Sequence, residues 1–166
     1  MAIGGSHKSS NFPYINMAES STEASMTQGG IVIAGVTGAS TLLLGDAVFF
    51  AATAIWNKSV TVANYQAGLG IVVGGRATDM RVVQDDALVG TAVSTTGQEV
   101  LIGIYGMFKS LADVALATIG VRVTGGAVVA GRVSTTGIAA GNHIGVTVTA
   151  QAVVGSPLLV WVGGGF

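Results

Sequence analysis

Cysteine is absent from the 166 residues of this chain, and proline occurs only twice, at Pro13 and Pro157. Without cysteine the chain cannot form disulfides, thiolate zinc sites or a cysteine nucleophile. Charge is also scarce, since Asp, Glu, Lys and Arg make up 9% of the residues and leave a net charge of -1. A nearly neutral chain lacks the basic surface of a nucleic-acid-binding protein, so no direct binding to nucleic acid is expected.

The low charged fraction predicts a surface that is largely covered. Soluble domains carry about 25% charged residues, and a net charge near zero favours association. We therefore expect copies of the same chain or another protein to cover much of this surface. In the alternative, Ser, Thr, Gly, Asn and Gln residues keep this surface hydrated in place of charged ones. At this length one domain is expected, with a core that needs no metal or disulfide.

Long hydrophobic runs are missing as well, although the mean hydropathy is +0.69. Residues 24–45 and 133–166 contain no Asp, Glu, Lys or Arg. Gly, Thr, Gln or Asn nevertheless interrupts both stretches every few positions, unlike a membrane span of about 20 apolar residues. Residues 1–16 show no basic region followed by an apolar one, so no secretory signal is expected. The pattern predicts a soluble protein made in a cytoplasm.

The composition divides the chain into two regions. Residues 1–29 are rich in Ser and Thr and poor in large apolar side chains, which predicts an extended N-terminal arm. The exception is Phe12-Pro13-Tyr14-Ile15, an apolar patch that either docks on a partner or folds back on its own domain. Residues 30–166 form the predicted β domain.

Short β-branched runs bounded by Gly or Asn predict strands throughout residues 30–166. The chain is therefore predicted to be all-β, with a compact β-sandwich or β-barrel-like domain. The pair Gly125-Gly126 predicts a hairpin turn with positive φ. The expected strands cover residues 31–33, 47–50, 60–62, 71–73, 81–83, 100–102, 121–123, 127–129, 144–150 and 158–162.

One short helix is expected within residues 109–118. Ser110 is a candidate N-cap, Asp113 follows three residues later, and the apolar residues that follow share a helical face. Residues 51–55 carry a weaker helical pattern.

A weak repeat occurs in Gly45-Asp46-Ala47-Val48, Gly97-Gln98-Glu99-Val100 and Gly141-Asn142-His143-Ile144. Each copy has Gly, a side-chain amide or carboxylate, any residue, and a β-branched apolar residue. We expect a turn in which the Gly is left-handed and the polar side chain accepts a hydrogen bond from a backbone amide. The unequal spacing excludes a solenoid or propeller.

Residues that could catalyse a reaction or bind a metal are few. His7 and His143 do not form a ligand pair, and Asp85-Asp86 lacks the alternating acids of a calcium loop. Nucleophile-elbow and phosphate-binding motifs are also absent. We therefore expect no metal, no cofactor and no enzymatic activity. A small β-barrel enzyme using Asp85 or Asp86 is the least favoured alternative.

The candidate interface residues are large and apolar: Phe12, Tyr14, Ile15, Trp56 and Trp161. Both tryptophans are expected in the core or at an interface. A carbohydrate-binding module would instead use Trp56, Trp161 or Tyr65 as stacking surfaces. Because few prolines or charges protect the sheet edges, the sequence favours a closed barrel or a symmetric oligomer.

Three segments are similar to a known family. Residues 90–108, Gly-Thr-Ala-Val-Ser-Thr-Thr-Gly-Gln-Glu-Val-Leu-Ile-Gly-Ile-Tyr-Gly-Met-Phe, resemble the middle of the capsid decoration, or head cement, proteins of tailed bacteriophages. Residues 131–146 resemble the closing stretch of that family, and residues 37–48 resemble its opening strand. Residues 51–80 look like an insertion, and residues 151–166 run past the family's usual end.

This resemblance implies a structural virion protein whose compact β domain commonly forms homotrimers. Such a protein binds the major capsid protein on the outer surface of the expanded head and stabilises the lattice against the pressure of packaged DNA. The resemblance implies no cofactor, no membrane and no direct contact with nucleic acid. The alternative function is a carbohydrate- or receptor-binding β module on a virion or cell surface.

Overall fold

The protein is almost entirely β-sheet, which confirms the predicted class. The computed structural model describes residues 30–52, 54–59, 69–126, 128–136 and 143–163. Besides strands, these residues form one single-turn 3-10 helix, η2 (Arg76–Thr78). The strands are β1 (Ile31–Thr37), β2 (Leu42–Leu43), β3 (Ala47–Ala52), β4 (Ile55–Lys58), β5 (Leu69–Gly75), β6 (Ala92–Ser94), β7 (Glu99–Leu111), β8 (Arg122–Gly125), β9 (Val133–Ser134), β10 (Gly145–Thr147) and β11 (Pro157–Val162).

Five strands close into a barrel, so the barrel form of the prediction is the correct one. β1 pairs with β4 in parallel, and β4–β3, β3–β5, β5–β7 and β7–β1 pair antiparallel. The ring ends where it began, at β1. Closure leaves the paired strands without free edges along the ring, which is how an all-β domain avoids recruiting other strands.

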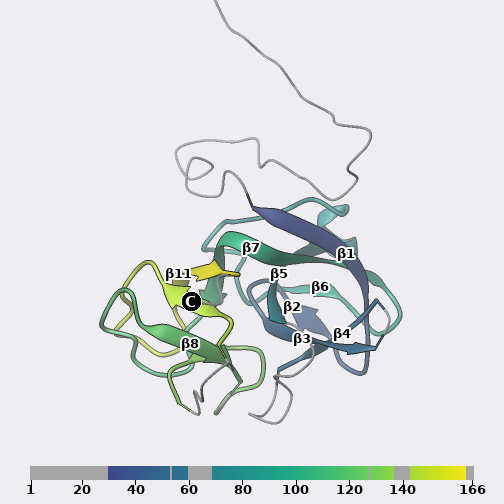
Figure 1. The fold of residues 1–166 in the computed structure, drawn as a ribbon. Coiled ribbons are helices and arrows are strands. Elements are labelled where there is room, and N and C mark those ends of the chain that lie inside the picture. Colours follow the sequence, from purple (N-terminus) through teal and green to yellow (C-terminus); the bar gives the residue numbers. More distant parts are fainter. Residues whose placement is uncertain (1–29, 53, 60–68, 127, 137–142, 164–166) are drawn as a thin grey trace, which may run out of the picture.

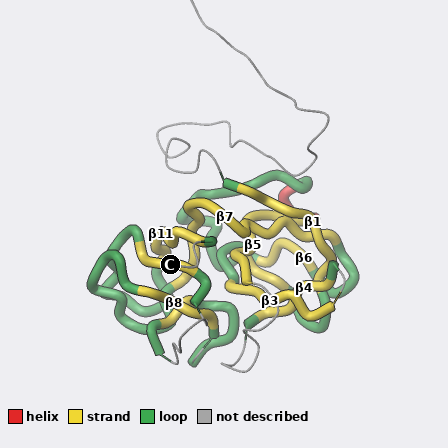
Figure 2. The backbone as a smooth tube through the Cα atoms, in the orientation of Figure 1, coloured by secondary structure: helices red, strands yellow, loops and turns green. Residues whose placement is uncertain are grey.

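A second lobe grows from the same long strand. The first part of β7 belongs to the barrel, and its last part, from Gly106 to Leu111, pairs with β11. The sheet continues through β10 and β8 to β9. Val133 of β9 then forms a parallel bridge with Ala112, just after β7. Figure 1 shows the two lobes side by side with β7 running between them, and loops make up much of the second lobe in Figure 2.

Alternating side chains divide the core into two clusters. One cluster contains Val48, Trp56, Val72 and Ile102 of four barrel strands together with Leu42 of β2 and Val93 of β6. The fifth barrel strand, β1, packs Ile33 against it. That cluster therefore fills the barrel, because side chains from every strand of a closed ring meet only inside it.

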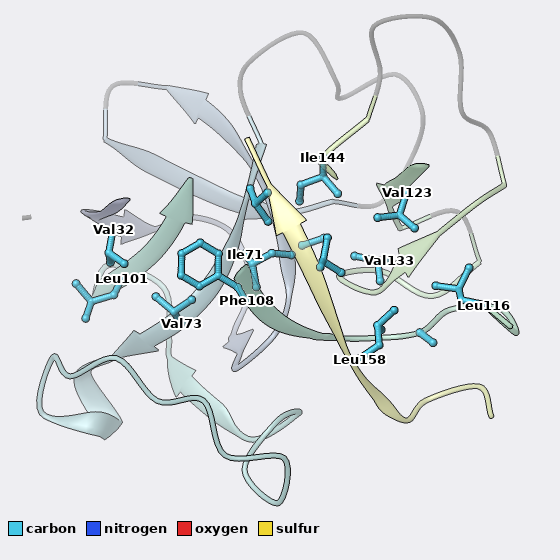
Figure 3. Packing of buried hydrophobic residues seen from close by; sticks show 14 residues of the cluster. Val32, Ile71, Val73, Leu101, Phe108, Leu116, Val123, Val133, Ile144 and Leu158 are labelled. Atoms are coloured by element: carbon cyan, nitrogen blue, oxygen red, sulfur yellow. The ribbon is translucent and has the colours of Figure 1, made fainter. Parts of the chain in front are cut away.

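The second cluster joins the lobes. It combines barrel residues such as Ile71 and Val73 with residues of the second lobe. The Phe108 ring, 1% exposed, lies beside Ile71 and Val73 (Figure 3). A Cβ at Gly103 would lie 2.5 Å from that ring. Because one continuous core crosses the junction, the two lobes are expected to unfold together.

The helix predicted within residues 109–118 is wrong. β7 continues to Leu111, and its residues Lys109 and Ser110 pair with Leu159 and Leu158 of β11. The Ser110 hydroxyl donates to the Gly45 carbonyl (2.6 Å) instead of capping a helix. The pattern over ten residues is compatible with a helix, but pairing with a distant strand overrides such local preferences. The weaker helical pattern of residues 51–55 is also wrong, since Ala52 ends β3 and Ile55 begins β4.

Most of the predicted strands are confirmed. The exceptions are residues 81–83 and 128–129, which form no strand, and the run 144–150, of which only β10 is a strand. Residues 60–62 and 127 lie outside the described residues. Gly126 has the expected positive φ of 65°. However, the strand that pairs with β8 in this hairpin is β9 and not residues 127–129. The connection between the two hairpin strands is therefore longer than predicted.

The predicted turn is confirmed in two of its three copies. Gly45 and Gly97 have φ values of 85° and 79°. The Asp46 carboxylate accepts a hydrogen bond from the Leu43 amide (2.7 Å), and the Gln98 side chain accepts one from the Thr95 amide (3.1 Å). In each turn the backbone amide of the same polar residue also donates to the carbonyl three residues earlier. Gly141 and Asn142 of the third copy lie outside the described residues.

Candidate interaction surfaces

An apolar row crosses the outside of the second lobe. Met107 of β7 pairs with Trp161 of β11, and Trp161 pairs with Val146 of β10. Cross-strand partners share one face of a sheet. All three side chains are only half-buried. The row therefore presents apolar surface to its surroundings.

Two exposed residues extend this row toward β1. The Tyr105 ring meets the Trp161 ring edge-on, with centroids 5.5 Å apart and planes at 75°. Tyr105 also pairs with Ile31 of β1, and these side chains are 43% and 44% exposed. Edge-to-face packing orients the two rings and stabilises the pair by roughly 1 kcal/mol beyond burial. We call Ile31, Tyr105, Met107, Val146 and Trp161 the aromatic face.

A second apolar surface lies on two loops of the second lobe, residues 128–132 and 151–156, which we call the valine loops. Val128 and Val129 are 71% and 39% exposed, and Val153 and Val154 are 61% and 52% exposed. Loops usually present polar side chains to water, so four exposed valines on neighbouring loops are a candidate binding surface.

Two consecutive residues, Ala112 and Asp113, form hydrogen bonds with both valine loops. The Asp113 carboxylate, 4% exposed, accepts hydrogen bonds from the amides of Val128 (2.7 Å) and Val129 (2.8 Å). The preceding residue, Ala112, donates to the Ser156 carbonyl and accepts from the Gly155 amide. A buried carboxylate that binds two backbone amides is a strong local anchor. These hydrogen bonds tether the backbone of both loops close to the exposed valines.

A buried ion pair lies where the second lobe meets the barrel. Asp46 Oδ2 lies 3.0 Å from Lys58 Nζ, and these side chains are 4% and 17% exposed. Burial raises the pKa of Asp46 to about 6, although the Leu43 amide and the charges of Lys58 and Arg132 act in the opposite direction. The Ala47 amide donates to the Gly131 carbonyl at the same place. This arrangement joins the loop that carries Val128 to β3.

Of the five predicted interface residues, only Trp161 is described at the surface. It lies at the centre of the aromatic face. Trp56 is 4% exposed and packs against Phe50 inside the barrel, so it cannot serve as a stacking surface in this structure. Phe12, Tyr14 and Ile15 lie outside the described residues, as does Tyr65.

The residues considered for catalysis are scattered. Asp86 lies 2.9 Å from Lys109 Nζ, whereas the Asp85 carboxylate accepts from the Ala87 amide within its own loop. The half-buried His143 precedes β10. In the part of the chain that the structure describes, no three His, Asp or Glu side chains gather in a way that could hold a metal ion. No helix among those residues has the length and hydropathy to cross a membrane.

The sequence reasoning missed Tyr105 and all four valines of the loops. Tyr105 lies within the segment that resembles the phage family, but nothing local shows that its ring meets Trp161. Residues 127–129 were predicted to be a strand because they are β-branched and apolar. The pair Val153-Val154 did carry a signal, since two valines precede the turn residues Gly155-Ser156-Pro157.

The fold is similar to that of a solved phage protein, although the sequence comparisons find no match. No family model matches the chain, and a search of curated proteins finds no match. The structure is similar to the head fiber gp8.5 N base of bacteriophage phi29, with a TM-score of 0.44 and 12% sequence identity. The likeness covers 81% of this chain and 94% of that one.

Proposed function

We propose that this chain is a structural virion protein that binds the outer surface of an expanded phage head and stabilises the capsid lattice. Its partner would be the major capsid protein, contacted through the valine loops. The chain would act by binding alone, as a homotrimer, without catalysis or a cofactor. The observation that carries this proposal is the buried Asp113 carboxylate, which accepts hydrogen bonds from the backbone amides of the exposed Val128 and Val129 in the second lobe.

The physical argument rests on preorganisation. A loop that is already ordered loses little entropy on binding, so apolar contact translates more fully into affinity. Covering each valine would contribute on the order of 1 kcal/mol. The charged fraction of 9% fits a surface meant to be covered. The sequence resemblance to capsid decoration proteins supports the major capsid protein as the partner.

Binding would stabilise the shell by mass action. A protein that binds only the assembled, expanded lattice stabilises it by about 4 kcal/mol per site at a thousandfold excess over Kd. An oligomer that reaches several capsid subunits would dissociate more slowly without any new kind of contact.

Co-sedimentation with expanded heads of the virus that encodes the chain tests the proposal. The Val128→Ser/Val153→Ser variant is expected to bind about thirtyfold more weakly, because two apolar contacts of about 1 kcal/mol each are lost. Leu88→Ser is the matched control, since Leu88 is 43% exposed in the loop between η2 and β6. Undiminished binding by the double variant would overturn the proposal. Saturable quenching of Trp161 fluorescence by sugars, with no head binding at all, would favour the carbohydrate-binding alternative.

A further inference from the structure

We propose that the aromatic face is a docking site for this chain's own Phe12-Pro13-Tyr14-Ile15, bound within the same molecule. The proposal concerns the free protein and does not depend on what the valine loops bind. Three observations support it: the composition of the face, the place where residues 1–29 join the domain, and the chemistry of the four residues.

The face is large, apolar and shaped by two rings. Tyr105 and Trp161 meet edge-on, and Ile31 and Met107 flank them as cross-strand partners. Tyr105 and Ile31 remain more than two-fifths exposed among the described residues. Aromatic pairs of this kind form the walls of grooves that bind proline-containing segments.

Gly30, the first described residue, follows residues 1–29 directly and lies at the edge of this face. A Cβ at Gly30 would lie 2.9 Å from the Phe108 ring and 3.2 Å from the Tyr105 carbonyl oxygen. A Cβ at Gly106 would lie 2.7 Å from the Gly30 Cα. Residue 30 is thus packed against the backbone next to Tyr105. Residues 1–29 therefore join the domain beside the proposed docking site.

The segment carries one set of residues that complements the face. Phe12 and Tyr14 are the only aromatic residues among residues 1–29, and they flank Pro13. Proline holds φ near -65°, so this stretch loses little entropy when it binds in an extended form. Phe12-Pro13-Tyr14-Ile15 carries no charge. Its burial against Tyr105 and Trp161 would therefore need no ion to be desolvated.

The geometry favours docking within one molecule. Fourteen residues lie between Ile15 and Gly30, and a stretch of that length can span up to about 50 Å. Adjacent strands lie about 4.8 Å apart, so the tether can reach every part of the face. A short tether also gives an effective concentration of about 1 mM, above that of a second copy in a dilute solution.

Fluorine NMR on the full chain labelled with 5-fluorotryptophan tests the proposal. The two signals, from Trp56 and Trp161, are assigned with Trp161→Phe. In Phe12→Ser/Tyr14→Ser, the Trp161 signal is expected to shift while the Trp56 signal stays in place. The matched control is Ile3→Ser/Met26→Ser, which removes two other apolar residues from the segment and is expected to move neither signal. An unchanged Trp161 signal in the first variant would overturn the proposal.

A spin label provides the second measurement. The chain has no cysteine, so Ser10→Cys gives a single attachment site. The label is expected to broaden the Trp161 signal more than the Trp56 signal, independently of protein concentration over about a hundredfold range. Broadening that vanishes on dilution would replace the docking within one molecule by docking on a second copy. Broadening that requires added phage heads would show that the segment docks on the capsid, and would also overturn the proposal.

Discussion

At the scale of single residues, Asp46 links the folding of this protein to pH. Its pKa is raised from 3.8 to about 6, chiefly by burial. The folded state therefore holds a proton that the unfolded state has already lost between these two pH values. The stability contributed by this group is highest below about pH 4 and decreases as the pH rises toward about 6.

The first prediction concerns Asp46→Asn. The rise of the Asp46 pKa from 3.8 to about 6 corresponds to at most about 3 kcal/mol of stability lost between pH 4 and pH 7. An Asn side chain can still accept the hydrogen bond from the Leu43 amide but cannot ionise. The free energy of unfolding of the variant is therefore expected not to decrease between pH 4 and pH 7 in this way. Urea denaturation at several pH values measures the free energy of unfolding of both proteins. Asp79→Asn is the control, since the Asp79 side chain is 84% exposed. Parallel profiles for the wild type and Asp46→Asn would contradict the account.

The second prediction compares the two turn glycines. A Cβ at Gly97 would meet no atom within 4 Å. The only cost of Gly97→Ala is therefore the strain of alanine in a left-handed conformation, about 1 kcal/mol. Alanine at Gly45 has the same strain, and its Cβ would also lie 2.7 Å from Val89. Gly45→Ala is therefore expected to lower the free energy of unfolding by more than Gly97→Ala. Equal losses in thermal denaturation would show that the packing around Gly45 adjusts freely.

At the scale of elements, β7 organises the molecule. It pairs with β1 and β5 in the barrel and with β11 in the second lobe. The residues just after it, Ala112 and Asp113, hold the valine loops. One strand thus positions both the core and the candidate binding surface.

The third prediction tests the anchor of the valine loops. Asp113→Ala removes the acceptor for the amides of Val128 and Val129. The expected loss of stability is about 3 kcal/mol, because hydrogen bonds to a buried charge are lost. Hydrogen exchange at these two amides is expected to accelerate more than exchange within the barrel. Glu99→Ala, which removes a carboxylate whose side chain is 61% exposed, serves as the control. Unchanged exchange at Val128 and Val129 would show that the loop is held by other contacts.

The elements were predictable where local pattern and tertiary pairing agree. Residues 71–73 and 100–102 are β-branched runs, and both are strands buried in the barrel. Prediction failed where the local pattern and the tertiary pairing disagree. Residues 109–111 fit a helix locally but pair with β11, and Val128 lies in a loop because Asp113 holds its amide. Such distant pairings leave no periodic signal in the sequence.

At the scale of the whole molecule, the two lobes share one strand and one core. The all-β class followed from the short β-branched runs bounded by Gly or Asn. The choice of a barrel over a sandwich did not, because ring closure depends on the β1–β7 pairing. The candidate surfaces were predictable only in part. The size of Trp161 drew attention to it, while Tyr105 joins it only through the fold.

The low charge of the chain now has a structural counterpart. Among the described residues, exposed apolar side chains gather in two places, the aromatic face and the valine loops, while Ile55, Leu88 and Ile119 are exposed elsewhere. We propose that the chain's own N-terminal segment covers the first and that the capsid covers the second. If both are correct, a freely diffusing copy would expose chiefly the surface that binds the head.

The stability of phage heads is the most direct test of the proposed function. Purified expanded heads that lack this protein would be heated with and without a saturating amount of it, while release of the packaged DNA is followed. The account predicts that the protein raises the temperature of DNA release and that the Val128→Ser/Val153→Ser variant does so less effectively. Unexpanded heads should neither bind the protein nor be stabilised by it. An unchanged release temperature at full saturation, or equal binding to both kinds of head, would contradict the account.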